Sequence, residues 1–207
     1  MKSVLNCIRD VKSREIMSQV ERRIREFRRT REQDADSIFK ELCFCILTAN
    51  YNAEGGIRIQ KEIDDGFIKL SEKKLARKLK ELGHRFPNTR AKYIVEARKH
   101  RNALHKNLRF MNDNALREWI VSNIKGLGYK EASHFMRNIG YDDVAIIDFH
   151  ILDFLEKHRM IERPKTLTPK KYMEIEEVVR KAASKSRMSL GELDLYMWYC
   201  ETGKVLK

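Results

Sequence analysis

A lysine and an aspartate in this chain have the types and spacing needed for covalent chemistry. Lys130 lies two residues after Gly128, and Asp148 follows 18 residues later within Ala145–His150. A lysine amine attacks an electrophilic carbon only in its neutral form, which burial or neighbouring cations favour, and we expect basic surroundings for Lys130. A carboxylate can stabilise positive charge that develops during such a reaction. Taken singly, Lys130 would be a solvent- or phosphate-facing lysine and Asp148 a helix N-cap, so the combination carries the catalytic interpretation.

The residues before the lysine predict a tight turn between two helices. Helical patterns over 113–123 and 129–139 flank a five-residue sequence that contains Lys125, Gly126 and Gly128. Glycine permits positive φ angles and leaves room for another backbone to approach. The start of the second helix offers unpaired amides and the positive end of a dipole, which together bind phosphate without reading a base. An ordinary helix–helix turn is the alternative.

The elements that must position these residues are helical. Only three prolines and nine glycines interrupt the chain, and no sustained alternation typical of strands is present. The predicted helices cover residues 13–32, 36–49, 57–65, 71–82, 89–105, 113–123, 129–139, 148–158, 170–185 and 189–200. Residues 159–169, with two prolines, predict a surface loop.

We therefore expect an all-α fold of two helical lobes. One lobe would comprise residues 1–36 plus 143–207 as an N/C-terminal lobe. The other would comprise residues 37–142 and carry the helix-hairpin-helix motif at 113–139. The active site would lie in a cleft between them.

The charge of the chain favours a polyanionic partner. Lys and Arg number 43 against 30 Asp and Glu, giving a formal net charge of +13 over 207 residues, and nucleic acid is the first candidate. The sequence shows no apolar run of spanning length and no signal peptide, so we expect a cytoplasmic, nucleoid-associated protein without membrane contact. The four cysteines lack the spacing of zinc or iron–sulfur sites. We expect no metal and no required cofactor, with a monovalent cation at the hairpin carbonyl groups left open.

The order of the motifs resembles that of the helix-hairpin-helix DNA glycosylases, which include endonuclease III. Their pattern is a G-x-G hairpin, a lysine and then D-x-H, and this chain has Gly126-Leu127-Gly128, Lys130 and Asp148-Phe149-His150. Within that superfamily the chain looks most like the compact 8-oxoguanine DNA glycosylase/AP lyase family of archaea and some bacteria. The further supporting segments are Leu47–Asn50, Lys130–Phe135, Asp194–Tyr199 and the terminal Lys207. The chain departs from endonuclease III in having Lys125 where proline is frequent and in lacking the cluster cysteines, as the compact family also does.

This resemblance implies a bifunctional enzyme. Lys130 would attack the anomeric carbon of a damaged nucleotide and form a Schiff base, while Asp148 stabilises the charge that develops on the sugar. β-Elimination would then cleave the abasic strand. The implied partner is double-stranded DNA containing 8-oxoguanine, bound by a monomer. The residues expected at the DNA backbone are Lys125, Gly126, Gly128 and, by resemblance, His150, for which a structural role is the alternative.

Excision also requires that the damaged nucleotide leave the stack and that a side chain fill the gap. The segment Leu47–Asn50 resembles the family loop that fills this gap, which implies that Asn50 is the side chain that enters it, with Asn52 assisting. The alternative is that Asn50 only terminates the preceding helix. Phe86 lies in a turn rather than on a helical stripe and is expected to line the pocket or wedge beside the lesion.

Two further residues are expected at the base. Spacing alone places Trp198 in the core, and only the resemblance gives it a role in stacking on a flipped purine. The family's terminal lysine is implicated in distinguishing 8-oxoguanine from guanine, and the resemblance implies the same role for Lys207. Its ammonium and carboxylate are able to hydrogen-bond the groups that differ between the two purines. A frayed tail is the alternative.

Two other functions stay open at this point. The lesion could be an oxidised pyrimidine, as for endonuclease III, which excision assays on defined duplexes would reveal. The chain could instead be a non-catalytic helix-hairpin-helix DNA-binding module, which would bind DNA and form no covalent adduct.

Overall fold

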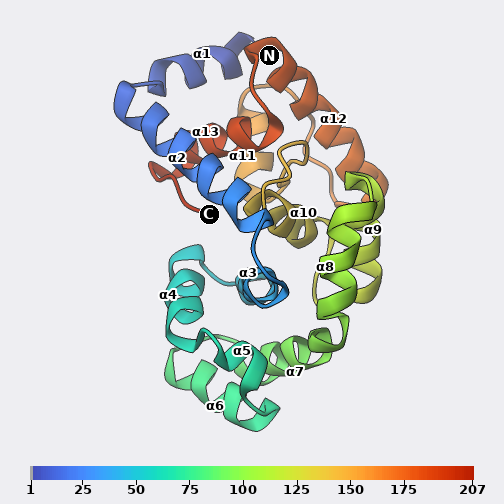
Figure 1. Ribbon diagram of the computed structural model, residues 1–207. Helices are drawn as coiled ribbons and strands as arrows, with labels where there is room; N and C mark the ends of the chain where they lie inside the picture. The colour runs from blue at the N-terminus through green and yellow to red at the C-terminus, as the bar shows by residue number, and fades with distance from the viewer. Residues whose placement is uncertain (1) are drawn as a thin grey trace. The chain divides into compact units, whose positions relative to one another are not determined.

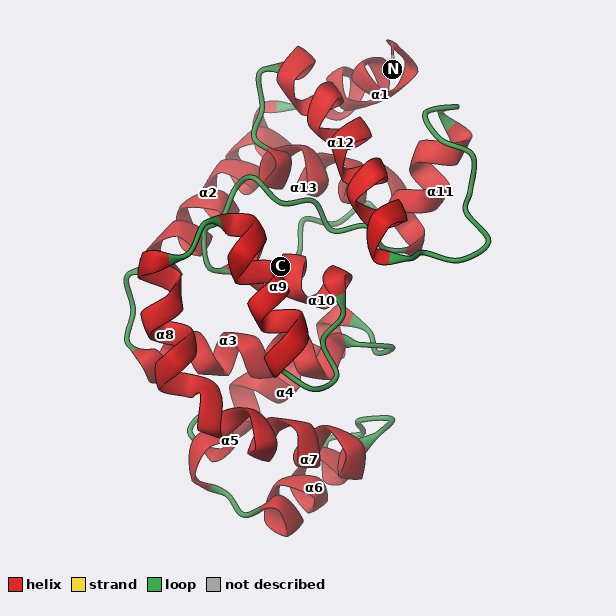
Figure 2. Cartoon of the chain, turned by 90° about the vertical axis from the view of Figure 1, so that its right-hand side faces the viewer, coloured by secondary structure: helices red, strands yellow, loops and turns green. Residues whose placement is uncertain are grey.

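The computed structural model describes residues 2–207, and within that range every regular element is a helix (Figure 1; Figure 2). This confirms the all-α prediction. The elements are α1 (Lys2–Val11), α2 (Arg14–Arg31), α3 (Ala35–Thr48), α4 (Ala53–Ile63), α5 (Gly66–Lys69), α6 (Glu72–Glu81), α7 (Pro87–Ala97), the 3-10 turn η1 (Arg98–His100), α8 (Arg101–Phe110), α9 (Asp113–Asn123), α10 (Tyr129–Asn138), α11 (Phe149–Lys157), α12 (Pro169–Ser186) and α13 (Leu190–Thr202). No helix in this range is both long and apolar enough to cross a bilayer.

Most predicted helices match observed ones within a few residues, but one is divided, and two observed helices, α1 and α5, were not predicted. The pattern over 89–105 is one helix in the sequence but is divided by η1 into α7 and α8. No glycine or proline marks this break; instead Arg98 donates to the Phe67 carbonyl oxygen at 2.8 Å. Helix α1 was not predicted, because its buried apolar face rests on few positions, Val4 and Ile8 among them.

The chain divides into two compact units, which are described separately. The terminal unit comprises the residues up to Arg29 together with Met136–Lys207, and the central unit comprises Thr30–Phe135. The divisions therefore fall within α2 and within α10, each a few residues before the predicted limits at 36 and 142.

In the terminal unit, α2 buries the predicted stripe of Ile16, Val20, Ile24 and Phe27. At the end of α10 the backbone turns at Gly140, whose φ is +83°. A Cβ there would lie 2.8 Å from the Cα of Arg28, so the approach of α2 requires glycine.

In the central unit, α3 is buried along most of its length, and α4 packs closely against its end. We expected the next helix to begin after Gly55-Gly56, but both glycines lie inside α4. A Cβ at Gly56 would be 2.8 Å from Thr48 Cγ2, and one at Gly55 would be 2.6 Å from the Tyr51 ring. The glycines thus serve tertiary packing rather than a turn. Asn52 caps α4 by accepting from the Gly55 amide at 2.7 Å, so its side chain has a structural role.

Candidate functional site

The predicted hairpin is present between α9 and α10. Of its two glycines only Gly126 has a positive φ, +89°, so the expectation of positive torsions was wrong for Gly128. A Cβ at Gly126 would lie 2.4 Å from the Tyr93 ring, whereas one at Gly128 would meet only Glu131 Oε2 at an ordinary 3.5 Å. Within the described part of the chain, Gly126 is needed for the turn itself, and nothing requires glycine at position 128.

The hairpin presents backbone donors at its surface. Lys125, Gly126 and Gly128 are all exposed. The Gly128 amide donates to Glu131 Oε2 at 3.3 Å. Among the described residues, no hydrogen bond uses the amides of Lys125 or Gly126. Free amides beside a helix N-terminus are the arrangement that binds a phosphate oxygen.

A buried arginine ties the two hairpin helices together. Arg117 of α9 is 1% exposed and donates to Ser133 of α10 and to Asn114, both at 3.1 Å. The start of α10 is therefore held to α9 by hydrogen bonds as well as by the turn.

Lys130 is the second residue of α10, with its side chain 28% exposed. We expected basic surroundings for its amine, but the amine forms an ion pair with Glu131, Nζ to Oε1, at 3.1 Å. A lysine attacks only as the neutral amine, so nucleophilic attack requires that this ion pair open and that the amine lose its proton. Glu131 was not singled out from the sequence. Its position, third in a helix that follows the hairpin, is where half of a capping box is expected.

Asp148 is the N-cap of α11. Its Oδ1 accepts from the Ile151 amide at 2.9 Å. The alternative interpretation of Asp148 as a helix N-cap is therefore correct as local geometry. It is compatible with a catalytic role, because the cap fixes the carboxylate at the positive end of a helix dipole, which stabilises negative charge.

Three aromatic rings lie together immediately beyond this cap. The His150 ring meets Trp198 of α13 edge to face, with centroids 4.7 Å apart, and lies 3.9 Å from the Phe149 ring. Trp198 is half-buried, and its Nε1 has no hydrogen-bond partner among the described residues, so it is not an ordinary core residue. Phe149 is 60% exposed; its position between Asp148 and His150 was the one signal that could have identified it.

In the central unit, α3 ends just before Asn50, which is exposed and has a φ of +59°. Two buried side chains hold the last carbonyl groups of this helix. His84 Nε2 lies 3.0 Å from the Leu47 oxygen, and Arg90 donates to the Ala49 oxygen. Helix termination is thus correct as geometry, and it leaves Asn50 exposed beside carbonyl groups that two buried side chains bind.

The same histidine reaches Phe86. His84 Nδ1 accepts from the Phe86 amide at 3.0 Å, so its other nitrogen donates to Leu47 and the ring is neutral. Burial lowers the pKa of His84, in agreement. Phe86 is 37% exposed, and the guanidinium groups of Arg85 and Arg90 lie 5.0 and 5.9 Å from its ring centroid. One histidine therefore connects Phe86 to the C-terminal end of α3, the helix that precedes Asn50.

The C-terminal tail begins where α13 ends at Gly203, whose φ is +68°. Lys207 is partly buried and takes part in a polar or electrostatic interaction. No cluster of metal-ligating side chains occurs in the described range.

The structure groups the predicted residues by unit. Lys125, Gly126, Gly128 and Lys130 share one hairpin, with Asn50 and Phe86 in the same central unit. Asp148, His150, Trp198 and Lys207 belong to the terminal unit. The pairing of Lys130 with Asp148 stays a prediction.

An all-helical chain with a glycine hairpin, a lysine at the start of the next helix and a capping aspartate has the features of the helix-hairpin-helix DNA glycosylases. Its sequence matches the family model for 8-oxoguanine DNA glycosylase over residues 20–188, and the chain belongs to that family.

Individual relatives are similar over nearly the whole chain. The 8-oxoguanine DNA glycosylase/AP lyase of Methanocaldococcus jannaschii is 54% identical over 97% of both sequences, and that of Korarchaeum cryptofilum is 51% identical over 99% of this chain and 98% of its own. A crystal structure of the M. jannaschii 8-oxoguanine glycosylase/lyase in complex with a 15mer DNA containing 8-oxoguanine covers 100% of both chains, with a TM-score of 0.95 and 53% identity. The 8-oxoguanine DNA glycosylase of Thermotoga maritima has a TM-score of 0.94 at 45% identity, over 100% of this chain and 99% of its own.

Proposed function

We propose that Lys130 and Asp148 carry out the family's two reactions in this chain, which is a bifunctional 8-oxoguanine DNA glycosylase/AP lyase. The observation that carries the proposal is similarity over the full length to relatives of that activity, one of them crystallised with 8-oxoguanine DNA. The proposed partner is double-stranded DNA containing 8-oxoguanine.

The proposed sequence of events begins at the hairpin, whose amides bind a phosphate and bring α10 to the DNA backbone. Asn50 fills the gap left by the flipped nucleotide, while Phe86, Trp198 and Lys207 contact the base. These roles are supported by the exposure of Asn50 and Phe86 and by the indole N–H of Trp198, which has no acceptor among the described residues.

The chemistry then follows from an amine and a carboxylate. The Lys130 amine, once deprotonated, forms a bond to the anomeric carbon as the base departs with the electrons of the glycosidic bond, and Asp148 stabilises the positive charge on the sugar. The amine loses a proton and the sugar ring opens to a Schiff base. Removal of a proton from the adjacent carbon expels the 3′ phosphate and cleaves the strand.

Reduction with borohydride during incubation with 8-oxoguanine duplex tests the nucleophile. The native chain should give a covalent adduct, and Lys130→Gln should give none while still binding the duplex. Lys106→Gln, the same change at an exposed lysine of α8, is the control and should trap like the native chain. Equal trapping by Lys130→Gln would place the nucleophile elsewhere.

The same assay reveals the alternatives. Trapping on a duplex with an oxidised pyrimidine, and not on 8-oxoguanine, would assign the other lesion class. Binding without any adduct from the native chain would indicate a non-catalytic module.

A further inference from the structure

The segment that leads into Asp148 has neither helix nor sheet to hold it. Residues 144–147 are non-helical, and their four side chains, from Val144 to Ile147, are between 0 and 6% exposed. Buried backbone amides need hydrogen-bond partners. Here the amides of Ala145 and Ile147 each find one on a side chain from another helix, and a third buried side chain lies near Ile146.

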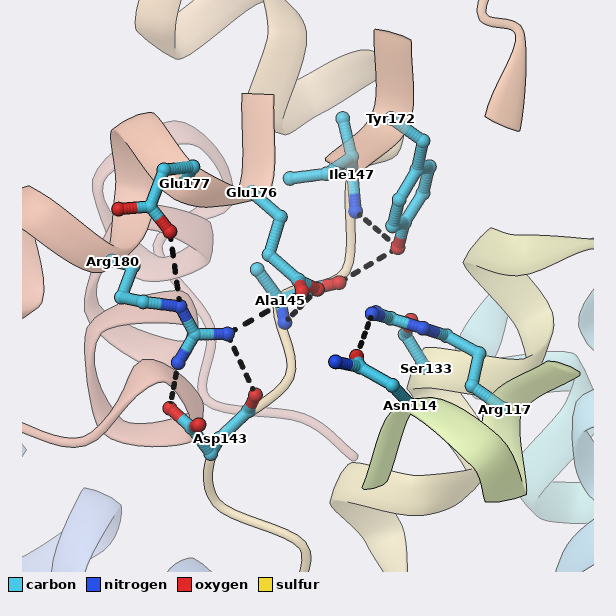
Figure 3. A network of polar contacts seen from close by, with 10 residues as sticks. All are labelled: Asn114, Arg117, Ser133, Asp143, Ala145, Ile147, Tyr172, Glu176, Glu177 and Arg180. Carbon is cyan, nitrogen blue, oxygen red and sulfur yellow. Dashed lines mark hydrogen bonds and ion pairs between the residues drawn. The ribbon is translucent and has the colours of Figure 1, made fainter. Parts of the chain in front are cut away.

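Two of these side chains come from α12 (Figure 3). Glu176, 1% exposed, accepts from the Ala145 amide at 3.0 Å. One turn earlier on the same helix, Tyr172, 2% exposed, donates to the Ala145 oxygen at 2.7 Å and accepts from the Ile147 amide at 3.1 Å. The tyrosine hydroxyl thus bridges both ends of a three-residue stretch.

The third side chain comes from α13. Asp194, 3% exposed, lies near the Ile146 backbone, which lowers the pKa of Asp194, and forms an ion pair with the buried Arg137. Burial raises the pKa of Asp194 to about 6 against the opposing effect of Arg137, and the charge of Asp148 raises it further.

The Glu176 carboxylate is itself held by an arginine of the same helix. Arg180, one turn further along α12, lies 3.5 Å from Glu176 Oε1 and donates to the Asp143 carbonyl oxygen at 3.2 Å. It also pairs with the Asp143 carboxylate (Figure 3). The segment is thus fixed from its start, at Asp143, to the residue before Asp148.

We propose that Tyr172, Glu176 and Asp194 are positioning residues that set the direction of the Asp148 carboxylate. The inference rests on the proposed function, in which that carboxylate faces the sugar. Asp148 is held on its C-terminal side by its cap of Ile151, and on its N-terminal side the chain enters it through this segment. Releasing the segment lets the carboxylate shift, and a misplacement of about 1 Å can slow catalysis by on the order of 100-fold.

Tyr172→Phe tests the inference by removing one oxygen atom and leaving the ring. We expect single-turnover excision at saturating enzyme to slow by about 10- to 100-fold, with the Kd for an uncleavable abasic-analogue duplex changed by less than about threefold. The matched control is Tyr196→Phe, a buried tyrosine of the same unit whose ring lies beneath Lys12; it should alter neither value. All rates are compared at a temperature at which thermal denaturation shows each variant folded.

A second pair of variants separates positioning from bulk stability. Glu176→Ala removes the acceptor for the Ala145 amide, and we expect excision to slow by about tenfold or more. Glu176→Gln retains a carbonyl oxygen at that position and should recover most of the rate.

The outcomes distinguish the two proposals. A native chain that traps on 8-oxoguanine DNA, together with a full excision rate in Tyr172→Phe, would overturn the positioning role and leave the function intact. A loss confined to Kd would overturn it as well. Failure of the native chain to trap would overturn the function itself.

Discussion

The turn before Lys130 and the segment before Asp148 both lead into the first turn of a helix, yet they treat their backbone amides in opposite ways. In the hairpin, the amides of Lys125 and Gly126 have no acceptor among the described residues. In the segment, the amides of Ala145 and Ile147 are each bound by a buried side chain. A backbone that must bind a ligand leaves its donors unused, whereas one that must hold a carboxylate still has them satisfied internally.

The residue types follow the same difference. The hairpin uses glycine, which costs conformational entropy on folding but lets the backbone turn and another chain approach. Three of the four residues from Val144 to Ile147 are β-branched, a type that favours extended backbone and fills a buried environment. The glycine hairpin suits a surface that contacts DNA, and the buried segment suits a support that holds the Asp148 carboxylate in place.

The largest effect on excision is expected at Asp148, the residue that the buried segment leads into. Asp148→Asn keeps an N-cap of equal quality but removes the negative charge, so excision should fall by on the order of 10²–10³-fold with little change in melting temperature. Single-turnover kinetics and thermal denaturation measure the two quantities. Full activity in this variant would mean that Asp148 only caps α11.

The two hairpin glycines offer a matched pair with the next largest effect. Gly126→Ala places a Cβ against Tyr93 at positive φ and should lower the free energy of unfolding by about 1–3 kcal/mol. Gly128→Ala meets no such obstacle and should leave stability within about 1 kcal/mol, while weakening DNA binding by roughly tenfold, about 1.4 kcal/mol. Denaturant unfolding and Kd at fixed salt give both values. Normal DNA binding by Gly128→Ala would show that no DNA backbone approaches there.

A smaller effect is expected at the exposed lysine of the hairpin. Lys125→Gln should weaken binding similarly for all duplex sequences and reduce the slope of log Kd against log salt by about one. Titrations of lesion-containing and undamaged duplex over a range of salt concentrations provide the slopes. An unchanged slope would mean that Lys125, which lies 3.9 Å from Glu96, remains with that carboxylate in the complex.

Sequence patterns were sufficient where the cause is local. The hairpin, the lysine after it and the capping aspartate all depend on spacings of a few residues, and the helical periodicity located most helices. The contacts that hold the segment before Asp148 could not be predicted, because Glu176 lies 31 residues from Ala145 and Tyr172 lies 25 from Ile147. In the sequence alone, a buried Glu or Tyr on α12 looks like a break in the apolar face of the helix, because its hydrogen-bond partner is not known. Gly55-Gly56 misled for the same reason, since tertiary packing rather than a turn requires them.

His84 also acts on a backbone group that is distant in sequence. Unlike the two regions above, where the groups concerned are amides, this one is a carbonyl oxygen at the end of a helix. His84 lies 37 residues from Leu47, whose carbonyl oxygen it binds at the end of α3, and it connects that end to Phe86. Burial, with a smaller contribution from Arg90, lowers its pKa in the folded chain below the ordinary 6.5. Since the unfolded chain takes up the proton first, the stability due to neutral His84 is complete above pH 6.5 and is lost as pH falls toward the folded pKa.

This titration is the smallest effect we predict, at most about 1.4 kcal/mol per pH unit. His84→Gln supplies one amide donor for Leu47 and one acceptor for Phe86 without a titratable group. The native chain should therefore lose more stability than this variant between pH 7.5 and 5.5, as measured by denaturant unfolding at both values. Because all other titrating groups are common to both chains, an equal loss in the two would mean that His84 can be protonated in place. The end of α3 would then be a flexible support for Asn50 rather than a rigid one.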